Sequence, residues 1–147
     1  MEEFNWMEMM EKMQEIRLFS SLHIRGKRHG ATSPQEVDIL SRMMLSEEPL
    51  TPLGLTAITG LSKSAVSRLI ESLEQKQFLV KEYSKEDKRS YTLHITGKGD
   101  QELQQAYQHY LQPIYKLRRT LGEERFQSLL TQIKEANQML QNKEGIK

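Results

Sequence analysis

A short stretch of hydroxyl and basic side chains holds the residues of this sequence best suited to a specific chemistry. Lys63 and Ser64 are followed three to four residues later by Ser67 and Arg68, a spacing that places these side chains on one face of a helix. Their ammonium, guanidinium and hydroxyl groups can bind phosphate oxygens or the edges of bases. The opposite face is apolar. The stretch is therefore predicted to be an amphipathic helix able to lie in the major groove of double-stranded DNA.

Three further cations follow in a hydrophilic segment. Lys85, Lys88 and Arg89 lie between the runs 78–83 and 91–95, both of which are rich in β-forming residues. This pattern predicts a hairpin, with the cations at its tip. Because it follows the basic helix directly, the hairpin is predicted to act as a wing beside that helix. An arginine at the tip suits the narrow, electronegative minor groove.

The elements before the basic helix predict a helix-turn-helix. Thr51 and Pro52 form a typical helix start, and Gly60 ends that helix just before Ser62 caps the next one. Two helices joined by so short a turn, with glycine at the corner, are typical of this motif, although such corners also occur in proteins that never touch DNA. An earlier helix is predicted from Ser33 to about residue 46, because Ser-Pro-Gln-Glu is a capping-box start.

Apolar residues at helical spacing extend on both sides of this region. The stretch 4–22 has an apolar face broader than one neighbouring helix requires, and burial within one chain is the alternative to burial against a partner. Two further stripes follow near the C-terminus, with a kink predicted at Pro113 and a break at Gly122. A small winged domain does not need two such helices for its own core. Residues 1–24 and 100–147 are therefore predicted to be dimerisation helices that intertwine in a homodimer.

The composition excludes several classes of protein. A length of 147 residues fits one domain, and a formal net charge of +1 argues against nucleic-acid binding through bulk charge. The absence of cysteine excludes disulfides, thiolate ligands and sensing by cysteine oxidation. No apolar run reaches the ~20 residues of a membrane-spanning helix, and the acidic N-terminus is unlike a signal peptide. We therefore expect a soluble, cytoplasmic protein with no membrane partner.

Catalytic and metal-binding patterns are missing from the sequence. The four histidines are scattered, and none forms a metal-ligand spacing with an acidic residue on the same helical face. There is no glycine-rich phosphate loop, nucleophile elbow or H-E-x-x-H motif. We therefore predict no metal, no cofactor and no enzymatic activity.

The order of elements and the hairpin motif together resemble the MarR family of bacterial transcription regulators. The resemblance rests on the run 50–99, on the D-x-R-x-x-x-L spacing of Asp87, Arg89 and Leu93, and on the T-x-K-G motif at 96–99. It covers nearly the whole chain. It implies a mainly α fold of the α+β winged-helix type, in which a winged helix-turn-helix at residues 33–99 is joined to N- and C-terminal dimerisation helices in a single domain, 1–147.

The resemblance also implies a function and roles for the basic residues. A homodimer would bind a palindromic operator in double-stranded DNA and repress transcription by blocking the polymerase, although activation is an alternative. Arg89 would enter the minor groove, and Asp87 would hold that arginine or a neighbour by a salt bridge. Ser64, Ser67 and Arg68 would contact DNA from the major groove. A winged helix that binds another protein is the competing interpretation, which an apolar wing face would favour.

The resemblance further implies a small aromatic effector, bound between the dimerisation helices and the winged domain, that lowers the affinity for DNA. The alternative for each candidate lining residue is an ordinary place in the core. These candidates are Met10, Met13, Phe19, His23, Met43, Tyr107 and Tyr110.

Two residues depart from the family pattern. Gln77 follows the basic helix where the family usually has glycine, so a left-handed helix end there would cost about 1 kcal/mol, or the helix must end differently. Thr56 stands where alanine is usual in the preceding helix. Neither residue touches the predicted wing.

Overall fold

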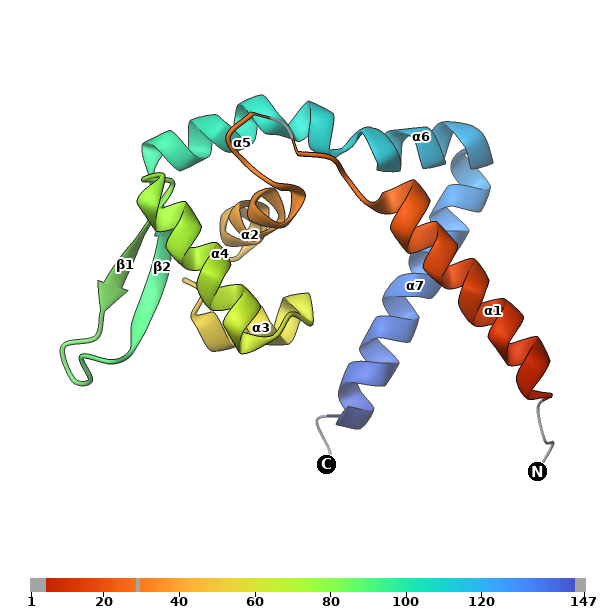
Figure 1. Ribbon diagram of the computed structural model, residues 1–147, viewed down its shortest axis with the longest axis horizontal. Helices are drawn as coiled ribbons and strands as arrows, with labels where there is room; N and C mark the ends of the chain where they lie inside the picture. The colour runs from red at the N-terminus through yellow and green to blue at the C-terminus, as the bar shows by residue number, and fades with distance from the viewer. Residues whose placement is uncertain (1–4, 29, 145–147) are drawn as a thin grey trace. The chain divides into compact units, whose positions relative to one another are not determined.

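The computed structural model describes residues 5–28 and 30–144, and the chain divides into two compact units (Figure 1). One unit is the continuous segment Arg25–Tyr110, and the other combines Met1–Ile24 with Leu111–Lys147. Each unit is described below by itself. None of the described helices is both long and apolar enough to cross a membrane.

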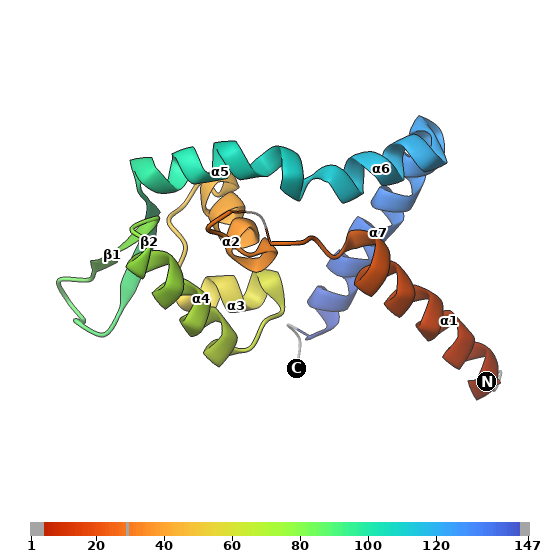
Figure 2. The same cartoon turned by 45° about the horizontal axis from the view of Figure 1, so that its top comes forward.

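The continuous unit has the winged helix-turn-helix order that the sequence predicts. Helix α2 packs against α5 and β2, α3 packs against α4, and the end of α4 leads into the hairpin (Figures 1 and 2). The two strands form an antiparallel two-stranded sheet. The elements are α2 (Pro34–Leu45), α3 (Pro52–Thr59), α4 (Lys63–Gln75), β1 (Leu79–Tyr83), β2 (Tyr91–Ile95) and α5 (Gly97–Tyr110).

One hydrophobic core joins these elements. Helix α4 buries Val66, Ile70 and Leu73, whose spacing of four and three residues is that of one helical face. Each such side chain contributes roughly 1.5–3 kcal/mol when it is removed from water. The other buried apolar residues are Val37, Ile39, Leu40, Leu55, Phe78, Leu79, Leu93, Leu103 and Ala106.

The predicted helix starts are confirmed. The Ser33 hydroxyl accepts the backbone N–H of Glu36, and the Glu36 carboxylate accepts the N–H of Ser33, which completes the capping box. The side chains of Thr51 and Ser62 cap α3 and α4 by accepting the N–H groups of Gly54 and Ala65, without the reciprocal side-chain bond. Gly60 ends α3 in the left-handed region, with a φ of +73°.

The hairpin has a fixed register that separates its two faces. Lys81 pairs with Leu93, and Tyr83 pairs with Tyr91. The N–H of Leu93 also donates to the carbonyl of Leu50 at 2.8 Å, so a bridge from the α2–α3 connection covers part of the free edge of β2. Leu79 is buried against the core. Because side chains alternate along a strand, Lys81 and Tyr83 lie on the same, core-facing side of the hairpin as Leu79.

The end of α4 differs from the expected position. The sequence predicts a helix to about Gln77, whereas α4 ends at Gln75 and Gln77 adopts a φ of +65°. Its N–H donates to the carbonyl of Glu74 at 2.9 Å, and the N–H of Phe78 donates to Leu73 at 2.9 Å. These two bonds make the left-handed helix end that glycine usually forms, so of the two alternatives for Gln77 the chain adopts the strained one.

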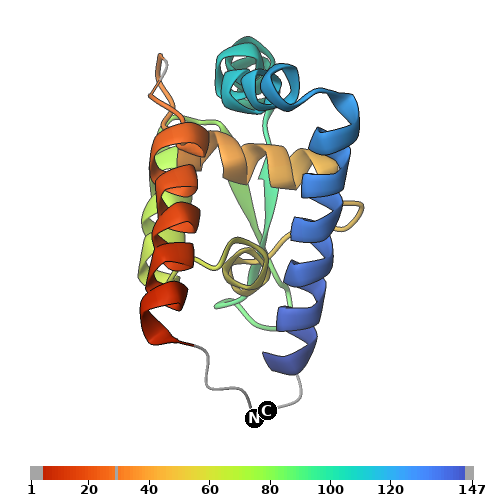
Figure 3. The same ribbon diagram turned by 90° about the vertical axis from the view of Figure 1, so that its right-hand side faces the viewer.

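In the part of the second unit that the structure describes there are four helical segments, and many of their apolar side chains are exposed. Segment η1 contacts α6, and α6 contacts α7. Helices α1, red, and α7, blue, stand apart in Figure 3, and α1 has no buried residue. The segments are α1 (Trp6–Leu18), the π-helical η1 (Phe19–Ile24), α6 (Gln112–Leu121) and α7 (Glu123–Glu144).

Two local features of this unit refine the sequence prediction. The first helix changes to π-helical geometry at Phe19, where the hydroxyl of Ser21 takes the carbonyl of Arg17 as its acceptor at 2.8 Å. The predicted starting residue, Phe4, lies outside the described residues. Near Pro113 the helix is interrupted rather than kinked, because α5 ends at Tyr110 and proline occupies the first turn of α6.

Candidate nucleic-acid interface

The face of α4 that the sequence singled out is free of the core. Lys63, Ser64, Ser67 and Arg68 are all exposed, while the buried residues of the helix face the other way. Ser62 caps the helix, so the free backbone N–H groups of its first turn and these side chains lie at the same end. Among the described residues, neither Lys63 nor Arg68 forms an ion pair. Both cations are therefore available to an anionic partner.

The wing loop is held by two side-chain turns. The Ser84 hydroxyl accepts the N–H of Glu86 at 3.2 Å, and one Asp87 carboxylate oxygen accepts the N–H of Arg89 at 3.0 Å. The Ser90 hydroxyl donates to the other Asp87 oxygen at 3.4 Å. Such turns fix the backbone of a short loop without a hydrophobic anchor. The loop therefore presents Lys85 and its neighbours on an ordered frame.

The role expected for Asp87 needs correction. The resemblance implies a salt bridge from Asp87 to Arg89 or a neighbouring cation, but within the described residues its carboxylate forms none. The carboxylate binds the main chain of Arg89 instead, because the turn brings that N–H closer than the guanidinium. Lys85, Lys88 and Arg89 are all exposed, and their charges remain unneutralised by any described acid.

The helix start and the wing loop lie on the same side of this unit. In Figures 1, 2 and 3, the beginning of α4 and the loop between β1 and β2 both point away from α5. Cations gathered on one surface favour binding to DNA over binding to a protein partner. A helix end with two free cations beside a loop with three is an arrangement that two grooves of one duplex can contact.

A buried carboxylate positions α4, and sequence reasoning missed this role. Glu36 is 3% exposed and accepts hydrogen bonds from the Ser72 hydroxyl at 3.1 Å, in the last turn of α4, and from the ammonium of Lys76 at 2.7 Å, directly after that helix. Lys76 also donates to the carbonyl of Ala31 at 2.8 Å. Sequence alone assigned Glu36 only to the capping box. The sequence signal that could have indicated this contact is the spacing of Ser72 and Lys76, which are four residues apart and so lie on one side of a helical stretch.

The charge of Glu36 is stabilised in the folded chain. Burial by itself raises the pKa of this carboxyl, but hydrogen bonds from Lys76, from the backbone of Ser33 and from Ser72, together with the Lys76 charge, lower it below its ordinary value of 4.5. Glu36 is therefore a buried anion with a full set of partners, and it ties α2 to the end of α4.

The candidate effector residues are divided between the two units. Met10 and Met13 are 52% and 48% exposed on α1, and the rings of Phe19 and His23 lie 6.4 Å apart on η1. In the other unit, Met43 and Tyr110 pack against the core, and Tyr107 is half exposed. Within residues 5–28 and 30–144, no three histidine or acidic side chains are grouped to hold a metal ion.

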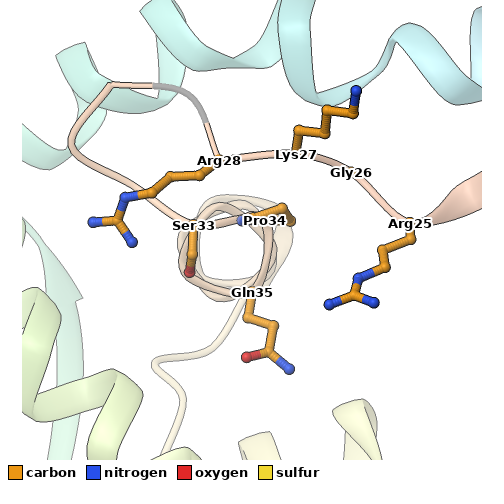
Figure 4. A pocket seen from close by; sticks show the side chains of 7 residues that line it. All are labelled: Arg25, Gly26, Lys27, Arg28, Ser33, Pro34 and Gln35. Atoms are coloured by element: carbon orange, nitrogen blue, oxygen red, sulfur yellow. The ribbon is translucent and has the colours of Figure 1, made fainter. Parts of the chain in front are cut away.

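A second basic cluster lies before α2. Arg25, Lys27 and Arg28 line a depression of about 580 Å³ together with Ser33 and neighbours at the helix start. Figure 4 shows that these three cations point in different directions rather than toward one point. Arg28 donates to the carbonyl of Ala31, beside the Lys76 end of α4. This cluster is therefore at the opposite end of α4 from Lys63.

Known proteins with similar sequences and folds are transcriptional regulators. The uncharacterized HTH-type transcriptional regulator YkoM of Bacillus subtilis (strain 168) is 30% identical over 123 residues, covering 78% of this chain and 75% of that protein. A MarR mutant from E. coli complexed with operator DNA has a TM-score of 0.74 at 16% identity, covering 88% of this chain and 95% of that one.

Another fold match is a MarR/EmrR family regulator from Acinetobacter sp. ADP1, with a TM-score of 0.76 at 21% identity, covering 95% and 99% of the two chains. A model of the MarR family matches residues 32–90, the segment that holds α2 to the wing loop. This family consists of transcription regulators rather than enzymes, as the sequence predicts. The chain belongs to the MarR family of transcriptional regulators.

Proposed function

We propose that this regulator binds double-stranded DNA in a sequence-specific manner as a homodimer on a palindromic operator. The start of α4 enters the major groove, where Ser64, Ser67 and Arg68 contact phosphates and base edges. Arg89 enters the adjacent minor groove, while Lys63, Lys85 and Lys88 bind the backbone. A dimer placed on a promoter blocks the polymerase, so the mode of action is repression in the cytoplasm.

The observation that carries this proposal is the set of free cations at one end of the winged unit. A net charge of +1 gives the whole chain no general affinity for DNA, so binding must come from a local cluster. The competing function, protein binding, is less well supported. On the hairpin, exposed Val80 lies next to Glu82 and His94, whose polar side chains contact each other at 2.8 Å, so that face is not a continuous apolar surface.

Dimer formation is supported by the unit that holds the terminal helices. Trp6, Ile16 and Leu22 are 72%, 66% and 65% exposed, and Met139 and Leu140 on α7 are exposed as well. Exposed apolar stripes of this extent are typical of protein interfaces. Two-fold symmetry presents two α4 helices, which suit half-sites about one helical turn apart.

The proposed homodimer can be checked by light scattering at micromolar concentration. A mass of twice 17.2 kDa is expected. A replacement of Ile16 by glutamate, which places a charge in the exposed stripe, is expected to favour the single chain. A mass of one chain for the unmodified protein would contradict the dimer.

DNA binding is tested by replacing the wing arginine. Arg89→Ala is expected to weaken binding to the protein's own promoter region at least about tenfold, a loss of about 1.4 kcal/mol or more, because the arginine no longer enters the electronegative minor groove. Arg28→Ala removes the same charge from the far end of the unit and is the matched control, with affinity expected to change less than about twofold. An affinity of R89A for this DNA that equals that of the unmodified protein at physiological salt would contradict the proposed DNA binding.

Release by a small aromatic effector is a further part of the proposal, carried by the family resemblance. One fold relative, BpsR of Bordetella bronchiseptica, has a DNA binding regulated by 6-hydroxynicotinic acid. For this chain, the proposed lining residues are Met10, Met13, Phe19, His23, Met43, Tyr107 and Tyr110. Aromatic acids that bind the protein should raise its melting temperature and release the operator. If none does so, the effector role fails while DNA binding stands.

A further inference from the structure

A lysine on the inner face of the wing connects the two parts of the proposed DNA-binding surface. The Lys81 ammonium lies 3.5 Å from a Glu74 carboxylate oxygen on α4 and 5.0 Å from the centre of the Tyr91 ring on β2. Its side chain is only 20% exposed. Lys81 therefore contacts both α4, through an ion pair with Glu74, and β2, through a cation–π contact with Tyr91.

The position of Lys81 along the hairpin gives this contact its importance. A two-stranded hairpin has little stability of its own, so neighbouring elements must fix its direction. Leu79 and Leu93 anchor the base of the hairpin in the core. Lys81 pairs with Leu93 and lies two residues after Leu79, so it is nearer to the wing loop than Leu79 is. Beyond Lys81 the rings of Tyr83 and Tyr91, tilted by 57° with their centroids 5.4 Å apart, join the strands to each other. Lys81 is thus a polar connection from the outer part of the hairpin to α4.

Small changes at Lys81 are magnified at the loop. Ser84 lies three residues after Lys81, a span of roughly 10 Å at about 3.3 Å per residue. A tilt of about 10° at Lys81 would therefore displace the loop by roughly 2 Å, more than the tolerance of a hydrogen bond. An arginine must enter a groove only about 6 Å wide, so this displacement matters for Arg89.

We propose that Lys81 is a positioning residue that holds the wing loop at a fixed place relative to α4, and so sets how Arg89 meets the minor groove. The inference rests on the proposed DNA binding. Lys81 acts through Arg89 and not through a phosphate of its own, because its ammonium is already shared between Glu74 and Tyr91.

Glu74 provides a test in which two explanations predict opposite signs. Glu74→Gln removes a negative charge from α4, which by simple electrostatics should strengthen binding to DNA. If Glu74 holds Lys81 in place, the same change releases the wing and should weaken binding about threefold. Lys81→Met, which keeps the length of the side chain but not its charge, should weaken binding about fivefold. Lys98→Met is the matched control, because Lys98 makes a similar ring contact, with Phe78 at 5.6 Å, at the other end of the sheet.

A double-mutant cycle with Arg89→Ala then shows whether Lys81 works through the arginine. With Arg89 already removed, Lys81→Met is expected to change affinity less than about twofold. An equal loss in both backgrounds would mean that Lys81 contacts DNA itself, and would overturn the inference. Stronger binding by E74Q would overturn it as well.

Amide hydrogen exchange in the free protein separates this inference from the proposed function. Faster exchange across residues 84–90 in K81M and E74Q, but not in K98M, is expected if Lys81 holds the wing. Unchanged exchange in all three variants overturns the inference, whatever the DNA results. If the unmodified protein fails to bind DNA while the exchange rates change as expected, the proposed function fails and the holding role of Lys81 stands.

Discussion

The hydroxyl of Thr96 donates a hydrogen bond of 2.6 Å to the carbonyl oxygen of Gln77. The same hydroxyl oxygen accepts the N–H of Gly99 at 2.9 Å, and the N–H of Thr96 donates to Phe78 at 3.1 Å. Thr96 therefore caps the start of α5 and at the same time holds the residue that ends α4. This junction keeps Gln77 in a left-handed conformation that its side chain disfavours.

Replacing Gln77 with glycine is expected to stabilise the fold by about 1 kcal/mol, because glycine reaches a φ of +65° without a steric penalty. Urea unfolding gives the free-energy difference. Gln75→Gly is the control: Gln75 is the last residue of α4, where glycine should destabilise by up to about 1 kcal/mol. A loss of stability in Q77G would contradict the strain assigned to this position.

Gly99 is required by a close approach to the sheet. A Cβ atom at this position would lie 2.0 Å from the carbonyl oxygen of Phe78, a backbone atom that cannot turn away. Gly99→Ala is therefore expected to cost about 1–3 kcal/mol through overpacking, measured by thermal unfolding. Gly97→Ala is the matched control, since a Cβ there meets open space. Equal melting temperatures for the two variants would disprove the close approach.

The features that could be predicted from sequence are those with local causes. The caps at Ser33, Thr51 and Ser62 bind N–H groups three residues away, so a short window contains both partners. The apolar spacing of α4 and the alternation of the hairpin are local as well. These signals are enough to place Lys63 at an exposed helix start and Arg89 in an exposed loop.

The features that could not be predicted depend on distant partners or on competing local bonds. Glu36 and Lys76 are forty residues apart in sequence, so their contact follows from the packing of α2 on α4. The carbonyl oxygen of Gln77 is bound by the hydroxyl of Thr96, nineteen residues later. The Asp87 carboxylate can bind either the backbone N–H of Arg89 or the side chain of a nearby cation, and the sequence alone does not show which of these partners it binds.

Acid is expected to weaken the tie between Glu36 and the end of α4. Because the pKa of Glu36 is lowered in the folded chain, its contribution is fully present above the ordinary pKa of 4.5 and is lost as pH falls through the folded-state value. Glu36→Gln leaves the Lys76 ammonium without its partner and is expected to cost about 1–3 kcal/mol at pH 7. Urea unfolding of both proteins between pH 7 and about 3 measures the difference.

The difference between the two proteins should shrink as the pH falls below 4.5, because the Glu36 carboxyl is protonated first in the unfolded chain and, at lower pH, in the folded chain as well. Glu135→Gln, on exposed α7, is the control and should leave stability at pH 7 within about 0.5 kcal/mol of the native value. A difference between native and E36Q proteins that stays constant from pH 7 to about 3 would contradict the lowered pKa of Glu36.

Tyr110, the last residue of α5, should ionise only at high pH. Burial, the charge of Asp38 and a hydrogen bond to that carboxylate at 3.3 Å raise its pKa to about 12, while Arg42 acts in the opposite direction. A raised pKa in the folded chain means that the neutral hydroxyl stabilises the fold below the ordinary value of 10.0, and that this contribution is lost as pH rises toward 12.

A pH titration followed by the near-ultraviolet absorbance of phenolate should therefore show a component that appears only near pH 12. Tyr110→Phe is expected to remove this late component. Asp38→Asn removes the charge that opposes ionisation and should move this component to lower pH, whereas burial alone would leave it in place. Tyr110→Phe is also expected to cost about 0.5–1.5 kcal/mol at pH 7, since Asp38 loses the Tyr110 donor and, among the contacts of its carboxylate within the described residues, is left with the Arg42 bond at 3.0 Å. Tyr115→Phe, on α6, is the control for removing one phenol. A titration curve of Y110F with the late component intact would show that another tyrosine ionises at high pH and that the Asp38 contact is not its cause.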